Sequence, residues 1–278
     1  MTSEEVALWR SLIVERCGLF FTDSRLYYLA QRLWERMQIH HFSAYDDYYR
    51  YLLLSRHGER EWLLLLEQLL NNETRFFRHG PSYRALREKV LFQLWEQKKD
   101  SEAPLQVWSV GCSGGQEVYS LAMLLLEWEL FEPEQITITG SDISCGKLQQ
   151  ARNGRYHSFE VESLPTYYRR KYMTQLDQGR DTIYEVTSDI RRLTEFSYLN
   201  LQVEPLEERV DRLDIIFCQN VLIYFTNELR SKIVNGLSHC LQPGGFIFFA
   251  PTDIVGLKMP HLRPVHFPDA LVFQRVVA

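Results

Sequence analysis

The chain has 278 residues, of which 45% are hydrophobic and 24% charged, a composition typical of one large globular domain or two smaller ones. Its formal net charge of −5 disfavours a general nucleic-acid-binding protein, because phosphate recognition usually requires an excess of basic side chains. Its five cysteines are widely spaced, which argues against a zinc site or a disulfide framework. The N-terminus lacks a signal-peptide pattern and no apolar run is long enough to cross a bilayer, so we expect a cytoplasmic protein.

The first hundred residues have helical periodicity and no strand pattern. The helices are expected near residues 2–17, 22–37, from 43 onward, 60–70 and from 81 onward. A polar stretch from Lys98 to Pro104 is the clearest boundary in the chain. We therefore predict a helical domain over residues 1–80, a linker helix and linker over 81–103, and a second domain over 104–278.

Strands and helices alternate in the second domain. We expect strands at 105–110, 136–140, 214–218, 246–250 and 271–276, and helices at 117–128, 144–152 and 228–241. Apolar strands that alternate with helices indicate an α/β domain with a mostly parallel sheet, covered by helices on both faces. Residues 181–201 differ, since "TIYEV" and "EFSYLNL" could form a small inserted β-hairpin.

A glycine-rich turn, "GCSGG" at 111–115, joins the first strand to the following helix. It lacks the lysine of a phosphate-binding P-loop and the spacing of a dinucleotide fingerprint. It does match G-x-S-x-G, in which Ser113 would be the nucleophile of a serine hydrolase. Asp214 or Asp253, with His261 or His266, would then complete a triad. Because helices precede the turn and no H-G-G-G segment does, we consider this alternative the weaker one.

The third alternative is an adenosine-bearing cofactor. A turn without bulky side chains lets a cofactor approach the backbone at the carboxyl end of the first strand. Asp142 closes the second strand, where its carboxylate could accept hydrogen bonds from ribose hydroxyls. S-adenosylmethionine has a ribose but no phosphate, which agrees with a turn that lacks basic residues. Asp142 could instead simply cap the helix that follows it.

Six segments of the chain together resemble one family. In chain order they are "NNETRFFRHG", "VWSVGCSGGQEVYSLAM", "GSDIS", "ARNGRY", "FSYLNL" and "DIIFCQNVLIYF". With them, the chain resembles the chemoreceptor glutamate methyltransferases, the CheR family, from its N-terminal helices almost to its end. The resemblance implies a small N-terminal helical domain followed by a class I (Rossmann-like) S-adenosylmethionine-dependent methyltransferase domain with an inserted β-subdomain. It also implies methyl transfer to glutamate side chains on the cytoplasmic domain of a methyl-accepting chemoreceptor. We expect a monomer that needs no metal.

The resemblance also implies roles for individual residues. Arg78 would orient the acceptor carboxylate, and Tyr224 would shape the methyl channel or donate a hydrogen bond to an acceptor oxygen. Because a glutamate carboxylate is already ionised at neutral pH, the reaction needs no general base. The cofactor would contact Asn72, Thr74, Arg78, Gly111, Glu117, Asp142, Asn200, Leu201, Asn220 and Val221.

A basic face is expected on the second helix. Arg25, Arg32 and Arg36 fall on one side if that helix is regular, and the resemblance implies that such a face approaches acidic receptor helices. A solvated helix face without a partner is the alternative interpretation.

The chain also departs from the family's pattern. Gln219 stands where the family usually has arginine, and Gln116 where it usually has glutamate. Residues 250–253, "APTD", replace a G-x-S-E-like segment. These changes leave open a second hypothesis, a cofactor-binding signalling module with weakened catalysis.

Overall fold

The computed structural model describes residues 1–100, 103–178, 181–206 and 212–276. These residues form two compact units. The first comprises residues 1–71 with the short segments 200–203 and 224–229, and the second contains the rest. Residues 101–102 of the predicted linker lie outside the described residues.

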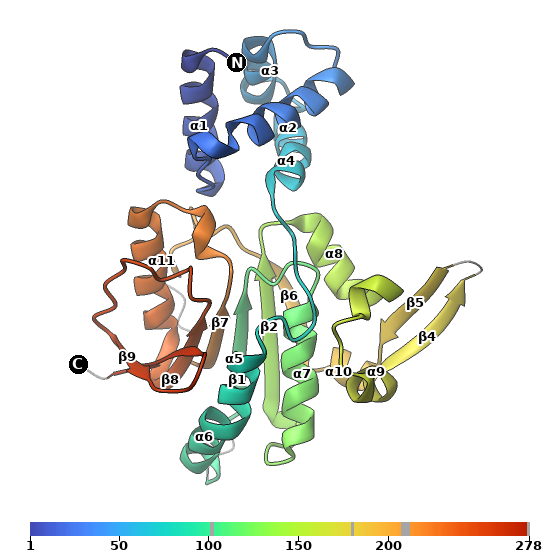
Figure 1. The fold of residues 1–278 in the computed structure, drawn as a ribbon, viewed down its shortest axis with the longest axis vertical. Helices are drawn as coiled ribbons and strands as arrows, with labels where there is room; N and C mark the ends of the chain where they lie inside the picture. Colours follow the sequence, from blue (N-terminus) through green and yellow to red (C-terminus); the bar gives the residue numbers. More distant parts are fainter. Residues whose placement is uncertain (101–102, 179–180, 207–211, 277–278) are drawn as a thin grey trace. The chain divides into compact units, whose positions relative to one another are not determined.

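The first unit is helical, with α1 (Ser3–Cys17), α2 (Leu26–Ile39), α3 (Tyr45–Leu54) and α4 (Gly58–Leu69) (Figure 1). A capping box between Thr2 and Glu5 begins α1, and Gly18 ends it with a φ of +75°. Such reciprocal caps satisfy backbone groups that a helix end leaves without intrahelical partners. The helices enclose a core that includes the fully buried Trp9 and Tyr48.

The second unit begins with α5 (Gly80–Ala85) and α6 (Leu91–Lys98), joined by a π-helical turn over Leu86–Val90. Its seven-stranded sheet has the order β6-β2-β1-β7-β8-β10-β9 (Figure 1). The strands are β1 (Leu105–Val110), β2 (Ile136–Asp142), β6 (Thr194–Tyr198), β7 (Leu213–Cys218), β8 (Leu241–Phe249), β9 (Leu262–Val265) and β10 (Leu271–Arg275). The first five pair in parallel, whereas β10 runs antiparallel to β8 and β9. The helices that follow or connect these strands are α7 (Gln116–Trp128), α8 (Cys145–Asn153), α10 (Ser188–Arg191) and α11 (Asn227–Cys240).

This architecture confirms the predicted fold class. All six residues of β7 are buried, as a strand covered on both faces requires. The strand order reverses between β1 and β7, because β2 lies on one side of β1 and β8 on the far side of β7. Ligands of open α/β sheets bind at the carboxyl ends of the strands beside such a switch point. The turns after β1, β2 and β7 therefore define where a cofactor site belongs.

The hairpin predicted over residues 181–201 is wrong. Its first half is β5 (Asp181–Val186), but β5 pairs with β4 (Met173–Gln178) and β3 (Arg155–His157) in a separate three-stranded sheet (Figure 1). Its second half is β6, which pairs in parallel with β2 in the main sheet. Helix α9 (Thr166–Tyr172) precedes β4. Short alternating strands look alike in sequence, so their pattern does not identify the partner strand.

None of the five cysteines, all of which lie among the described residues, forms a disulfide, and only Cys145 is exposed. Burial raises the pKa of the Cys17 thiol to about 12. It also raises the pKa of the Cys112 and Cys218 thiols well above their ordinary values.

Candidate functional site

The turns that follow β1 and β7 touch each other. Gly111 has a φ of +71° and donates its backbone N–H to the carbonyl of Ser141 over 2.8 Å. A Cβ at position 111 would lie only 2.4 Å from Cγ2 of Val221, so only glycine fits. The close approach brings two of the predicted cofactor residues, Gly111 and Val221, together at the switch point.

Asp142 ends β2 and is held against the glycine-rich turn. Its Oδ2 accepts a hydrogen bond from the Ser113 N–H, and its Oδ1 accepts one from the Ser144 N–H, both over 2.8 Å. The side chain that caps α8 is that of Ser144, whose Oγ accepts from the N–H of Lys147. Two backbone bonds therefore fix the orientation of the carboxylate at the carboxyl end of β2.

Glu117 lies in the first turn of α7, where its Oε1 accepts a hydrogen bond from the Ser109 hydroxyl over 2.8 Å. Burial raises the pKa of Glu117 to about 7, although the Ser109 hydrogen bond and the charge of Arg78 act to lower it. The Asp253 carboxylate adds to the rise. A carboxyl group with a pKa near 7 is only partly ionised at neutral pH. A nearby cation would stabilise its ionised form and lower that pKa.

The segment that carries Arg78 is fixed at several points. Ser113 Oγ donates to the Asn72 carbonyl over 3.2 Å, and the Phe77 N–H donates to Ser120 Oγ over 3.0 Å. Phe77 has a φ of +50°, a conformation that is unfavourable for a bulky residue unless its surroundings hold it. Arg78 itself donates to the Glu73 carbonyl over 2.7 Å, and its charge acts on the pKa of Glu117. The charge of Arg78 thus acts on one predicted cofactor residue, Glu117, while its guanidinium is held by Glu73.

Asp253 organises the turn after β7. It is fully buried, and its carboxylate accepts from the N–H groups of Asn220 (2.6 Å), Leu222 (3.0 Å) and Ala250 (3.1 Å). Asn220 has a φ of +61°, which asparagine tolerates better than most residues. From the sequence, Asp253 is expected only as a member of a serine-hydrolase triad. Its place in the segment that replaces G-x-S-E was the available signal for this structural role.

Three predicted residues belong to the first unit. The Asn200 side chain donates to the Arg16 carbonyl over 2.7 Å, and the Tyr224 carbonyl accepts from the Phe20 N–H over 2.8 Å. Leu201 is buried in the same unit. Arg78, Gly111, Glu117, Asp142, Asn220 and Val221 belong to the second unit, with Asn72 and Thr74.

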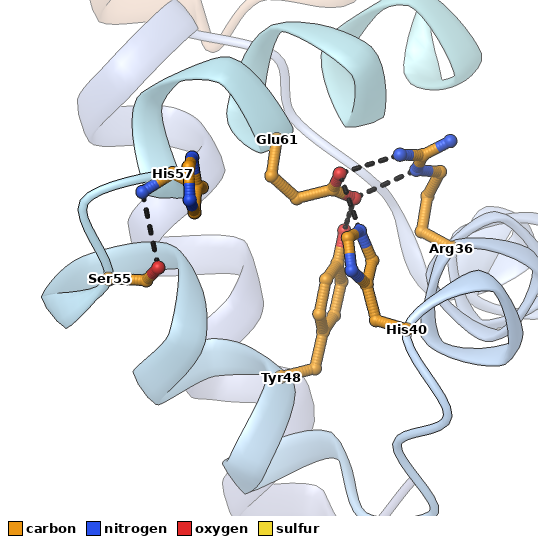
Figure 2. Close-up of polar contacts among 6 residues, drawn as sticks. All are labelled: Arg36, His40, Tyr48, Ser55, His57 and Glu61. Atoms are coloured by element: carbon orange, nitrogen blue, oxygen red, sulfur yellow. Dashed lines mark hydrogen bonds and ion pairs between the residues drawn. The ribbon is translucent and has the colours of Figure 1, made fainter.

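The predicted basic face of α2 is wrong for Arg36. Arg36 is 8% exposed and binds the buried Glu61 on α4 through two hydrogen bonds, of 2.8 and 2.6 Å. The His40 ring lies 2.8 Å from the same carboxylate, and the Tyr48 hydroxyl donates to it over 2.7 Å. Figure 2 shows these side chains converging on Glu61. A helical wheel places Arg36 beside other basic residues but does not reveal a carboxylate on another helix.

The two other arginines of that predicted face have partners of a different kind. The Arg32 guanidinium pairs with Glu35 over 2.8 Å, and it also lies 4.9 Å from the Tyr28 ring centre. The Arg25 guanidinium lies 5.3 Å from the ring centre of Phe21 and 5.9 Å from that of Tyr224.

The serine-hydrolase alternative finds no support in the geometry. The Ser113 hydroxyl donates to a backbone carbonyl, and within the described part of the chain no histidine is its hydrogen-bond partner. The carboxylate of Asp214 binds Lys98 over 3.0 Å, while that of Asp253 accepts three backbone N–H groups. A triad requires a base within hydrogen-bond reach of the nucleophile.

The donor set instead fits S-adenosylmethionine. The site combines Asp142, Glu117 and a glycine turn that carries no lysine or arginine. Carboxylates accept hydrogen bonds from ribose hydroxyls, and they attract the ammonium and sulfonium charges of this cofactor. A phosphate-bearing nucleotide would meet like charges at the same place.

Comparison with known proteins agrees with this geometry. A family model described as the S-adenosylmethionine-binding domain of CheR methyltransferases matches residues 72–264, and the model of the all-alpha domain matches residues 4–70. The chain belongs to the CheR methyltransferase family. It is therefore a methyltransferase with an S-adenosylmethionine-binding domain.

Named relatives of this CheR-family chain span most of its length. Chemotaxis protein methyltransferase 2 of Vibrio cholerae is 31% identical over 254 residues, which cover 91% of this chain and 86% of the relative. Chemotaxis protein methyltransferase of Borreliella burgdorferi is 27% identical, with 92% and 89% covered. Chemotaxis protein methyltransferase 1 of Pseudomonas aeruginosa is 27% identical, with 96% of each chain covered.

Among the described residues of this chain, none of the helices has the length and apolarity needed to cross a membrane.

Proposed function

We propose that this CheR-family methyltransferase transfers the methyl group of S-adenosylmethionine to glutamate side chains on the cytoplasmic domain of a methyl-accepting chemoreceptor. Such methyl esters would tune receptor adaptation. The proposal is supported by the charge of Arg78, which acts on the half-buried carboxyl of Glu117, within a site that fits the cofactor. The names of the relatives supply the link to chemotaxis.

The residues of the site divide into cofactor-binding and acceptor-binding groups. Asp142 would accept hydrogen bonds from the ribose, and Glu117 would face the positively charged methionine part of the cofactor. Asn72, Thr74, Gly111, Asn220 and Val221 would complete the surroundings of the cofactor in the second unit. Asn200 and Leu201 are proposed beside the adenine, and Tyr224 at the methyl channel, from their places in the family's motifs.

The chemistry requires placement more than proton transfer. S-adenosylmethionine supplies an electrophilic methyl group on a sulfonium. Arg78 would bind the acceptor carboxylate by a planar two-point contact, which leaves an oxygen lone pair directed toward the methyl group. A tighter ion pair would weaken that carboxylate as a nucleophile, so Arg78 orients rather than activates. The acceptor and the sulfonium neutralise each other as the bond forms, and a site that excludes water favours that neutralisation.

A labelling experiment tests the proposal. Purified protein is incubated with methyl-labelled S-adenosylmethionine and receptor cytoplasmic fragments, and the label is then exposed to mild base. A carboxyl methyl ester releases methanol in base, whereas methyl groups on amide or amine nitrogen persist. Arg78→Lys keeps the charge but removes the two-point contact, and we expect it to lower the rate much more than S-adenosylhomocysteine affinity. A base-stable label would contradict glutamate as the acceptor.

The same assay addresses the module with weakened catalysis. That hypothesis predicts little turnover by the natural sequence, and turnover gained by the double change Gln116→Glu with Gln219→Arg. Robust turnover by the unaltered chain would exclude it.

A further inference from the structure

Gln219, the residue that departs from the family's arginine, is part of a buried hydrogen-bonded chain. It directly follows β7, is 8% exposed, and donates from Nε2 to the Ser82 hydroxyl over 2.7 Å. Ser82 lies in α5 and is fully buried. Its Oγ is 2.8 Å from Nδ1 of His79. Three side chains thus connect the turn after β7 to the start of α5.

The tautomer of His79 sets the direction of its hydrogen bond with Ser82, and one arrangement of donors and acceptors makes His79 the acceptor. The Gln219 amide donates to the Ser82 oxygen, so the Ser82 hydroxyl hydrogen is available to donate to Nδ1 of His79. His79 is then neutral, with its proton on Nε2. Burial lowers the pKa of His79 and the nearby Arg84 lowers it further, which agrees with a neutral ring.

The two end residues of this hydrogen-bonded series, His79 and Gln219, are sequence neighbours of two residues of the proposed site. His79 immediately follows Arg78, and Gln219 immediately precedes Asn220. On its other side Arg78 adjoins Phe77, whose left-handed backbone is tolerated only if contacts outside the segment hold it. The bond from Phe77 to Ser120 holds one side of Arg78, and the bond from His79 to Ser82 holds the other.

We propose that Gln219 is a positioning residue that acts through Ser82 and His79 to hold Arg78 at a fixed position relative to the turn after β7. The inference rests on the proposed function, in which Arg78 orients the acceptor carboxylate. The amide is the suitable group at this position, because a guanidinium on the buried Ser82 would add a positive charge two hydrogen bonds away from His79, whose pKa the charge of Arg84 already lowers. The glutamine is therefore a functional alternative to the family's arginine rather than a sign of lost catalysis.

Steady-state methyl transfer to a receptor cytoplasmic fragment tests this assignment. We expect Gln219→Leu and Ser82→Ala each to lower kcat/KM for the receptor by roughly 10- to 100-fold, the scale of a 1 Å misplacement. The double variant should lose no more than either single variant, since the residues act as one unit. S-adenosylhomocysteine affinity, measured by calorimetry, should stay within about twofold. Gln149→Leu, on the exposed face of α8, is the matched control and should be unchanged.

The arginine variant gives the sharpest result. Gln219→Arg restores the family's residue, and we expect it to lower turnover. A gain in turnover, or a Gln219→Leu protein that binds S-adenosylhomocysteine and turns over normally, would overturn the assignment. Equal losses of cofactor affinity and turnover would also overturn it, because Gln219 would then act on the cofactor site.

A titration separates this inference from the proposed function. If the unaltered protein methylates no receptor glutamate, the proposed function fails and the hydrogen-bonded chain is judged by NMR titration of His79. Gln219→Glu places a carboxylate on Ser82 and should raise the pKa of His79, whereas Gln219→Arg should lower it. A His79 titration that neither change moves would show that the chain does not exist in solution.

Discussion

Replacing Glu61 by glutamine removes the charge that balances Arg36 inside the first unit. The carboxylate accepts two hydrogen bonds from Arg36, one from Tyr48 and one from His40. Arg36 is 8% exposed, so the variant leaves a cation largely buried without its counter-charge. Losing one partner of a buried ion pair costs about 3–5 kcal/mol, a large part of the roughly 5–15 kcal/mol that stabilises a typical domain.

Urea unfolding monitored by circular dichroism measures the effect, and hydrogen exchange of α2 and α4 amides assigns it to the first unit. Glu35→Gln is the control, because Glu35 pairs with Arg32 while its side chain is 38% exposed. We expect that control to leave the free energy of unfolding nearly unchanged, because exposed ion pairs contribute little. Replacing both Arg36 and Glu61 by methionine should recover much of the loss, since a buried ion pair is often no better than well-packed apolar residues.

The pair also predicts acid sensitivity. Burial alone would raise the pKa of Glu61, but the hydrogen bonds from Arg36, Tyr48 and His40 outweigh burial and hold it below its ordinary value. The stability from this group is therefore present above the ordinary glutamate pKa of about 4.3 and is lost as the pH falls through the lowered value. A Glu61→Gln protein as stable as Glu35→Gln, or one with unchanged acid unfolding, would refute this reasoning.

Three further predictions concern the second unit. Gly111→Ala should destabilise the protein and weaken S-adenosylhomocysteine binding, because the new Cβ would meet Val221. Gly256→Ala is the control: Gly256 has a similar left-handed φ of +77°, but a Cβ there meets open space. We expect it to lower the free energy of unfolding by only about 1 kcal/mol, measured by thermal unfolding. Since the pKa of Glu117 is raised to about 7, the cofactor-free protein should lose stability as the pH rises from about 4.5 to about 7. Glu117→Gln should remove this dependence of the melting temperature on pH. The same pH dependence of melting temperature in the variant and the unaltered protein would contradict the prediction. Asp142→Ala should abolish micromolar S-adenosylhomocysteine binding in calorimetry, and retained binding by folded protein would exclude a ribose contact.

Much of the fold was predictable because local patterns determine it. The strand over 105–110 and the helix after the glycine turn begin and end almost where periodicity and turn residues place them. The edge strand β6 was misassigned, because its partner β2 lies more than fifty residues earlier in the chain.

The site was less predictable, since its parts meet only in three dimensions. Motif positions suggested Arg78, Glu117 and Asp142. For Asp253, the departure from the family pattern at residues 250–253 marked the segment but did not reveal its hydrogen bonds to the turn at Asn220. The burial of Arg36 depends on Glu61, twenty-five residues away on another helix.

The exposure of Cys145 gives the chain a built-in attachment point for a spectroscopic reporter. The other four thiols are buried, and the raised pKa values of Cys17, Cys112 and Cys218 keep them protonated and unreactive toward maleimides at neutral pH. Cys145 is the first residue of α8, three positions after Asp142. An environment-sensitive dye at this single position would sense events at the end of β2 without any engineered cysteine, so occupancy of the site could be followed by fluorescence in otherwise unaltered protein.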